Sequence, residues 1–396
     1  MPVEVHDPRG SRALLRVAGV YDPVQGELSG PRTIVIENGR VSSVAENPAD
    51  SRGPHQHDFA HLFAMPGLID PHTHLTLATP GDERVQVGRP VEERLLRALG
   101  HMQTMLAEGV TTIRSMGEPA FLDVRCREAF KQDLLLGPRV LASGRMLGPT
   151  HADVALVDAP ADGDELLLRV RQNLAERTDW IKLYATPSSV PLFDNPRSSY
   201  FSPEEVGLVV ATARRAGRPV AAHAHGGEAV DFCIDAGVST IEHGRYLTDG
   251  QLEKMAQRGI TLCATAGIVC FDYAEEHGCS ADEALGATEH SIRRALEAGV
   301  NVVGGTDAVH GQLGFEVRAL EHFGMQRTEA LRAVTTRAAD VLSLGNDVGR
   351  IESGFAADIA LVPDDPRKGE RLPRPVVTIV GGRIAWCDSS EIGPLQ

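Results

Sequence analysis

A repeated rhythm in the middle of this chain, about residues 66 to 345, constrains its fold more than any other feature. Short apolar runs of strand length alternate there with longer stretches of helical pattern. Eight such runs follow one another: 67–70, 110–114, 139–143, 179–183, 219–223, 239–243, 260–263 and 300–304. Strands that alternate with helices predict a parallel sheet, and eight units of this kind suit a closed (β/α)8 barrel.

The two ends of the chain differ from this middle and resemble each other. Strand-like runs flank the turn Asn38-Gly39 near the start, and others flank Gly381-Gly382 near the end. Both patterns predict hairpins. We therefore expect a small β domain, a β-sandwich, built from residues 1–65 together with 346–396, and a barrel built from residues 66–345.

Side chains that bind metals well stand at the ends of several predicted strands. The first strand runs into Asp70-Pro71-His72-Thr73-His74, where residues two apart point to the same face and can present two imidazoles to one ion. Active sites gather at the C-terminal strand ends of a barrel. The candidate ligands, which fall on five strand ends, are His72, His74, Lys182, His223, His243 and Asp307.

Each of these residues has an ordinary explanation when it is taken alone. His223 could be a satisfied core histidine, Asp307 could cap the next helix, and Lys182 could cover apolar surface while its ammonium stays in water. Another pair, His55 and His57, lies in a stretch flanked by Pro and Gly and is interpreted as surface loop. The joint occurrence of the six candidates at successive strand ends favours a metal site.

The chain resembles the amidohydrolase superfamily from end to end, on several motifs. They are Pro66–His74, Gly109–Arg114, Ile241–Gly244, Gly305–Ala308 and Gly349–Ile359. The prolidase-like group, which includes Xaa-Pro dipeptidases and ochratoxin-type amidases, typically carries the patterns seen at Ala222–Gly226 and Ser239–Gly244. Segments that line the expected substrate pocket depart from the family pattern at Ser115, 147–153 and 184–187.

The resemblance implies a distorted (β/α)8 barrel that holds two divalent metal ions. One ion would take His72, His74 and Asp307 as ligands, and the other would take His223 and His243. His225 shares a strand face with His223 and is the alternative ligand.

Lys182 is implied to bridge both ions as a carbamate formed with carbon dioxide. An unmodified ammonium has no lone pair, whereas a carbamate offers two anionic oxygens. Zinc suits imidazole and carboxylate ligands, and manganese, cobalt and iron accept similar sets.

The implied activity is hydrolysis of an amide bond by a hydroxide that bridges the two ions. Asp307 would take the proton and pass it to the leaving nitrogen. His151 and Tyr246 are implied to hydrogen-bond the carbonyl or carboxylate of the substrate, and packing at the barrel rim is the alternative for Tyr246. We expect a dipeptide, an N-acyl amino acid or a related secondary amide as substrate. Arg145 and Arg245 are carboxylate-binding candidates by position only, and solvated surface charge is the favoured interpretation of both.

Other functions stay open at this point. A cyclic-amide or lactam hydrolase would use the same hydroxide. A heterocycle deaminase usually has a glutamate three residues beyond the metal histidine, where this chain has Gly226, and usually lacks the bridging lysine. A non-catalytic scaffold of this fold would have lost its ligands, whereas all six ligand types are present here.

Composition limits the partners of the chain. Its 54 acidic and 39 basic residues give a formal net charge of −15, which disfavours nucleic acid and anionic membranes as partners. The start of the chain lacks a signal-peptide pattern, and no apolar run approaches the ~20 residues that span a bilayer. The six cysteines form no C-x-x-C pair and are expected to be reduced thiols. We expect a cytoplasmic protein that acts on a small molecule and, by family habit, forms a homo-oligomer.

Overall fold

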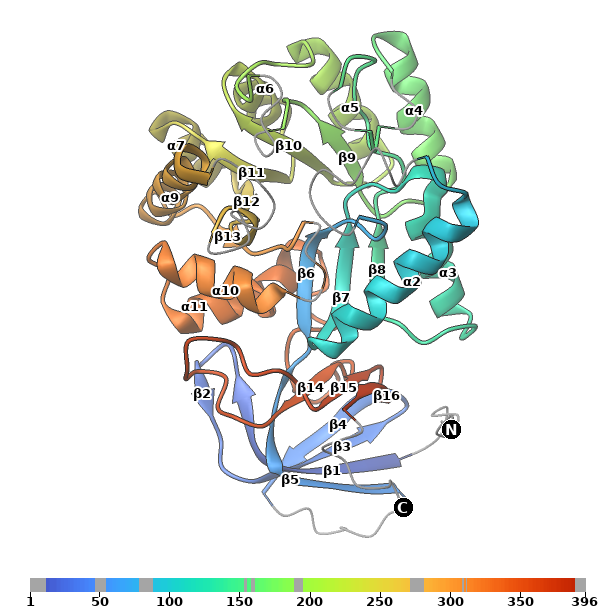
Figure 1. The fold of residues 1–396 in the computed structure, drawn as a ribbon, viewed down its shortest axis with the longest axis vertical. Helices are drawn as coiled ribbons and strands as arrows, with labels where there is room; N and C mark the ends of the chain where they lie inside the picture. The colour runs from blue at the N-terminus through green and yellow to red at the C-terminus, as the bar shows by residue number, and fades with distance from the viewer. Residues whose placement is uncertain are drawn as a thin grey trace.

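The strands of the middle region form two parallel arcs. The computed structural model describes residues 12–46, 55–77, 88–152, 155–157, 161–188, 195–270, 281–307, 310 and 312–388. All eight predicted strands are present, as β6 (Leu68–Thr73), β7 (Val110–Ser115), β8 (Arg139–Ala142), β9 (Ile181–Tyr184), β10 (Val220–Gly226), β11 (Thr240–Tyr246), β12 (Thr261–Cys263) and β13 (Val302–Val303). One arc has the order β6-β7-β8 and the other the order β13-β12-β11-β10-β9 (Figure 1).

The expected closed barrel is not present as a continuous hydrogen-bonded sheet. Single parallel bridges join the two arcs, Thr73 with Asp307 at one seam and Leu147 with Leu183 at the other. The first seam is short, since β13 has only two residues and Asp307, four residues beyond it, contributes a single bridge. The protein is thus an α/β structure whose parallel strands form a split ring.

Helices lie outside the two arcs (Figure 1). They are α2 (Val91–Ala107), α3 (Leu122–Lys131), α4 (Asp164–Ala175), α5 (Pro203–Arg215), α6 (Glu228–Ala236), α7 (Asp249–Arg258), α9 (Ala281–Glu297), α10 (Leu313–His322), α11 (Arg327–Ala333) and α12 (Thr336–Val341), with 3-10 turns η1 (Pro119–Phe121) and η2 (Gly267–Val269). Capping boxes fix two of the starts: Ser202 with Glu205 at α5, and Thr248 with Gln251 at α7. None of the described helices is long and apolar enough to cross a membrane.

Strands from both ends of the chain form one separate mixed sheet. They are β1 (Arg12–Asp22), β2 (Glu27–Leu28), β3 (Arg32–Glu37), β4 (Arg40–Ala45), β5 (His55–Pro66), β14 (Ile359–Val362), β15 (Val377–Val380) and β16 (Arg383–Cys387). Their order is β16-β15-β14-β5-β1-β3-β4, with β2 paired to β1. Both predicted hairpins are present, as β3–β4 and β15–β16.

Strand β5 joins the two ends of the chain and corrects one expectation. Its backbone pairs with β1 in parallel and with β14 in antiparallel orientation, so the N-terminal and C-terminal strands form one continuous sheet. The interpretation of His55 and His57 as surface loop is wrong, because both lie in β5. The polar residues at the start of β5 gave no strand pattern in the sequence.

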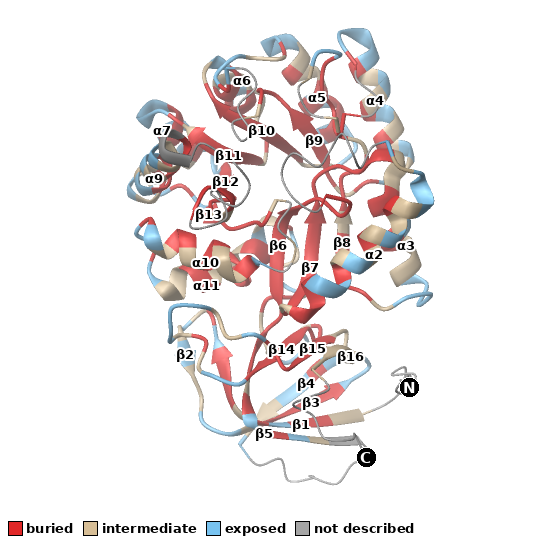
Figure 2. Cartoon of the chain, in the orientation of Figure 1, coloured by how far each residue is buried: buried red, intermediate tan, exposed pale blue. Residues whose placement is uncertain are grey.

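The core of the molecule lies between the arcs and their helices. Residues of β6, β7 and β10 are buried along their whole length, as Figure 2 shows for the strands of the middle region. Apolar side chains from these strands and from the inner faces of the helices form the largest buried cluster, and a second cluster fills the terminal sheet. Burial of this kind holds strand ends in fixed positions, which is what a preorganised site at those ends requires.

Candidate metal centre

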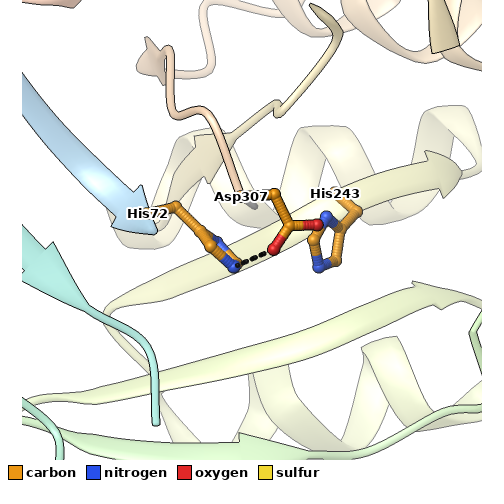
Figure 3. A group of neighbouring side chains, drawn as sticks. All are labelled: His72, His243 and Asp307. Carbon is orange, nitrogen blue, oxygen red and sulfur yellow. Dashed lines mark ion pairs between the residues drawn. The ribbon is translucent and has the colours of Figure 1, made fainter. Parts of the chain in front are cut away.

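Side chains from both arcs meet at the ends of β6, β11 and β13. His72 and His74 come from the end of β6 and are buried, with ring centroids 5.8 Å apart. Asp307 follows β13, and its Oδ1 lies 3.3 Å from His72 Nε2 and 3.6 Å from His74 Nε2. The ring centroid of His243, on β11, is 4.9 Å from that of His72. Figure 3 shows the Asp307 carboxylate between the imidazoles of His72 and His243.

Main-chain hydrogen bonds set the position of Asp307. Its N–H donates to the His72 carbonyl (2.7 Å), and its carbonyl accepts from the His74 N–H (2.8 Å). Asp70 strengthens the same seam by accepting bonds from the Thr306 hydroxyl (2.5 Å) and from the His72 N–H (3.1 Å). The backbone of two strands therefore fixes the spacing between the carboxylate and the two imidazoles.

A buried carboxylate orients His72 through the ring nitrogen that faces away from Asp307. His72 Nδ1 is 2.6 Å from Glu242 Oε2, and the Arg114 guanidinium donates to both oxygens of Glu242 at 3.0 and 3.2 Å. Burial alone would raise the pKa of Glu242, but Arg114 and His72 hold it well below its usual range. Glu242 is therefore ionised and keeps the proton of His72 on Nδ1, which leaves Nε2 with a free lone pair.

The neighbouring imidazoles have acceptors of their own. His74 Nδ1 is 3.1 Å from the Gly117 carbonyl, and His243 Nδ1 is 2.7 Å from the Thr265 hydroxyl. The carbonyl can only accept, so the Nε2 of His74 is also unprotonated and points toward Asp307. Such partners on the outer ring nitrogen are typical of histidines that bind metals.

Burial keeps three of the histidines neutral. Burial lowers the pKa of His74 to about 4 and lowers the pKa values of His223 and His243 well below the ordinary value. Burial would raise the pKa of Asp307, but the imidazoles of His72 and His74 together with Lys182 hold it well below its usual range. The arrangement offers neutral nitrogen donors beside an ionised carboxylate, the protonation states that a divalent cation requires.

Lys182 lies within the same cluster, on β9. Its side chain is only 1% exposed. Burial lowers the pKa of its ammonium to about 8, although the carboxylates of Glu242 and Asp307 act in the opposite direction. The alternative in which the ammonium of Lys182 stays in water does not hold, because the side chain is buried.

The structure brings both His223 and His225 close to His243. The ring centroid of His223 is 4.6 Å from that of His243, and that of His225 is 5.2 Å away. Both are buried at the end of β10. His223 also packs on Tyr184, with ring centroids 4.1 Å apart. Which of the two serves as the ligand stays a prediction, and the resemblance favours His223.

The two predicted substrate residues stand farther out than the histidine cluster. His151 is exposed and packs edge-on against Tyr200, whose ring stacks on Tyr184. Tyr246 is half-buried at the end of β11, with its ring centroid 6.4 Å from that of His225. Two tyrosines, Tyr200 and Tyr184, therefore separate His151 from the histidine cluster. Tyr246 lies next to the cluster.

Sequence reasoning missed the residues that hold the cluster in place. Asp70 and Glu242 lie within the motifs named above but were assigned no role, and Thr265 lies in none of them. The interpretation of Arg245 as a solvated surface charge is wrong, because its side chain is only 2% exposed. Arg145 is partly buried and lies over the ring of Phe121.

The donor set fits a divalent metal ion. Ligand atoms of His72, His243 and Asp307 lie within 4.8 Å of one another. His72 Nε2 is buried and makes no hydrogen bond within the described part of the chain. A second group, His72 with Glu242 and Cys263, is equally compact. Its Glu242 is already committed to Arg114 and to His72 Nδ1, so the first group is the better candidate.

Comparisons with known proteins agree with this geometry. The sequence profile of the Amidohydrolase family matches residues 63–385. Ochratoxinase from Aspergillus niger is 27% identical over 92% of this chain and 84% of its own length. A crystal structure of a Xaa-Pro dipeptidase with bound methionine is 25% identical, with a TM-score of 0.82 over 94% of this chain and 99% of its own. A putative prolidase from Bifidobacterium longum is 27% identical, with a TM-score of 0.81 over 95% of each chain. The chain therefore belongs to the amidohydrolase family.

Proposed function

We propose that this protein is a binuclear metal-dependent amidohydrolase that cleaves the amide bond of a dipeptide or an N-acyl amino acid. The observation that carries the proposal is the meeting of neutral histidines, an ionised aspartate and a buried lysine at one rim of the split ring. The similar proteins named above include an ochratoxinase and a Xaa-Pro dipeptidase. Their names support an amide bond next to an amino acid as the target.

Six side chains would hold the two ions. His72, His74 and Asp307 would bind one, His223 and His243 the other, and Lys182 would bridge them. Zinc is the favoured metal because imidazole and carboxylate donors suit it. Bound divalent ions of this kind lower the pKa of water and polarise a carbonyl oxygen.

Lys182 must be modified to act as a ligand, and its surroundings favour the modification. The lone pair of the neutral amine would attack the carbon of carbon dioxide, a C–N bond would form, and one proton would leave to solvent. The product is a carbamate with one negative charge shared by two oxygens. Burial supplies the neutral amine by lowering the pKa of Lys182 to about 8.

The remaining residues would position the reaction and move its proton. Asp307 would take a proton from the attacking water and deliver it to the leaving nitrogen, since its ionised carboxylate is fixed by the His72 and His74 backbone. Tyr246 would donate a hydrogen bond to the substrate from the rim. His151 would hydrogen-bond a more distant part of the substrate, beside Tyr200. A homo-oligomeric state and a cytoplasmic location stay predictions.

Metal content and hydrolysis test the proposal together. Elemental analysis of the purified protein should find about two metals per chain, falling sharply in Lys182→Ala. The same preparations would be screened against Xaa-Pro dipeptides and N-acyl amino acids, with release of the free amino acid as the readout. Bicarbonate should increase the activity of a preparation dialysed free of carbon dioxide, and Lys182→Ala should not respond. One metal per chain, unchanged by the substitution, would contradict the bridging lysine and would direct the search to heterocycle deamination.

A further inference from the structure

An arginine at the rim of the candidate site has an exposed charge and an aromatic support. The guanidinium carbon of Arg197 lies over the ring of Tyr246, 4.4 Å from its centroid. The residue is exposed, and within the described part of the chain no aspartate or glutamate forms an ion pair with it.

Aromatic neighbours connect this arginine to the histidine cluster. Tyr246 lies three residues beyond His243 at the end of β11, and its ring centroid is 6.4 Å from that of His225. The His225 ring is in turn 5.2 Å from that of His243. Arg197 therefore contacts the half-buried tyrosine directly, at the side of the site formed by β10 and β11.

The backbone that carries Arg197 is fixed on the same strand ends. The N–H of Arg197 donates to the Asn195 side chain (3.0 Å), and the Ser198 N–H donates to the Asn195 carbonyl (2.9 Å). The carbonyl of Arg197 rests against Gly227, where a Cβ atom would lie only 2.0 Å from it. The Tyr200 N–H closes the segment onto β9 by donating to the Ala185 carbonyl (2.9 Å). The guanidinium is thus presented from a positioned turn.

A guanidinium that stacks over an aromatic ring keeps its hydrogen-bonding edge available. The N–H groups of arginine lie in the plane of the group, so a ring on one face covers none of the fork that binds a carboxylate. Arginine is also the residue best suited to bidentate carboxylate binding. The rest of the protein is strongly acidic and would repel an anionic substrate, which gives a local cation at the entrance a selective role.

We infer that Arg197 binds the free carboxylate of the amino-acid portion of the substrate. This rests on the proposed function and deepens it, since it limits the substrates to N-acyl amino acids and dipeptides with an unblocked C-terminus. Carboxamides would lack the charge that Arg197 recognises, and so would peptides cleaved before an internal residue. Arg197 is then a specificity-determining residue, distinct from the groups that act on the scissile bond.

The test compares matched acid and amide probes. N-acetyl-L-phenylalanine and N-acetyl-L-phenylalaninamide would be incubated with the metal-loaded wild type, Arg197→Gln and Arg197→Lys, and release of acetate would be measured. Loss of a charge-assisted hydrogen bond should lower kcat/KM for the acid roughly 10–100-fold in Arg197→Gln, mainly through KM. The amide should react slowly, and at the same rate with the wild type and with Arg197→Gln. Arg197→Lys should restore part of the preference, because it keeps the charge and loses the fork.

Two controls make the result decisive. Arg16→Gln makes the same charge change at an exposed ion pair in the terminal sheet and should leave the acid-to-amide ratio unchanged. Calorimetry with L-phenylalanine and L-phenylalaninamide measures binding independently of turnover, and Arg197→Gln should weaken only the former. An unchanged preference for the acid in Arg197→Gln would overturn the inference while hydrolysis itself stood. If the wild type hydrolysed neither probe, the proposed function would be in question, and calorimetry would still decide whether Arg197 binds the carboxylate.

Discussion

His72 Nδ1 and Glu242 Oε2 lie 2.6 Å apart, and neither side chain is exposed to solvent. The imidazole comes from one arc of the split ring and the carboxylate from the other, since β6 and β11 belong to different sheets. Arg114, also buried and stacked on Trp180 at 4.3 Å, neutralises the carboxylate. The three groups form a polar unit beneath the candidate metal centre, and its role there can be separated from its role in stability.

Glu242→Gln should weaken metal binding by about 10–100-fold, because the amide no longer fixes the proton of His72 on Nδ1. It should also destabilise the fold by about 3–5 kcal/mol, because the guanidinium of Arg114 stays buried without its partner. Metal retained after dialysis against a graded chelator gives the first quantity, and urea denaturation gives the second. The double variant Glu242→Gln with Arg114→Met should recover stability and leave the metal affinity low. Full metal content in Glu242→Gln would show that the carboxylate serves the fold alone.

Thr265→Val should lower metal affinity without a comparable loss of stability. The hydroxyl of Thr265 is the partner of His243 Nδ1, and valine keeps the shape while removing the oxygen. We expect a decrease of about tenfold in affinity, at the lower end of what outer partners contribute. Thr265→Ser keeps the oxygen and is the matched control. Equal affinities for the valine and serine variants would assign the orientation of His243 to packing.

Glu118 should make the stability of this protein depend on pH in a direction opposite to most carboxylates. Burial, reinforced by the nearby Asp123, raises the pKa of Glu118 from 4.5 to about 8, although the hydroxyl and the N–H of Thr76 favour its ionised form. A carboxyl with a raised folded-state pKa binds its proton more tightly in the folded protein. Its contribution to stability is complete below about pH 4.5 and is lost as the pH rises toward 8.

Glu118→Gln isolates this effect, because the amide cannot ionise. The free energy of unfolding of the wild type, relative to the variant, should fall with a slope of at most about 1.4 kcal/mol per pH unit between pH 5 and 8. Urea denaturation at each pH gives the difference, from which titrations shared by both proteins cancel. A difference that stayed constant across this range would contradict the raised pKa.

Gly227→Ala should disturb the segment that presents Arg197. Gly227 has a φ of 69°, and an added Cβ would lie 2.0 Å from the Arg197 carbonyl oxygen, so the segment must move. Gly163→Ala is the control: its φ is 53°, and nothing lies within 4 Å of its added Cβ. Both variants carry a backbone cost of about 1–3 kcal/mol. Only Gly227→Ala should cost more and also reduce the preference for the acid probe, as measured by thermal unfolding and by the acetate assay.

The sequence predicted the regular parts of this molecule well. All eight strands of the middle region, both terminal hairpins and helices such as α2 and α5 lie within a few residues of their predicted bounds, because apolar periodicity reports burial directly. Strand β5 was missed because its first four residues are all polar, and with it the joining of the terminal strands into one sheet. The gaps in the ring were also missed, since strand pairing across the two seams is a tertiary feature that no local pattern reports.

For the candidate site, the meeting of three predicted ligands at one rim was predictable, and the residues that support them were not. Strand ends at one rim bring His72, His243 and Asp307 together as expected. Glu242 precedes His243 in the chain, but only the three-dimensional structure shows that it serves His72 instead. Arg197 lies in a polar segment between β9 and β10 and became meaningful through its contact with Tyr246.

The seam between Thr73 and Asp307 runs through the candidate site. His72 and His74 belong to one arc, while Lys182, His223, His243 and Asp307 belong to the other or follow directly from it. Opening this joint by even a small hinge movement would separate the two halves of the donor set. A metal ion bound by residues of both arcs would hold the arcs together. The arcs should therefore separate at the same temperature at which the ion is released.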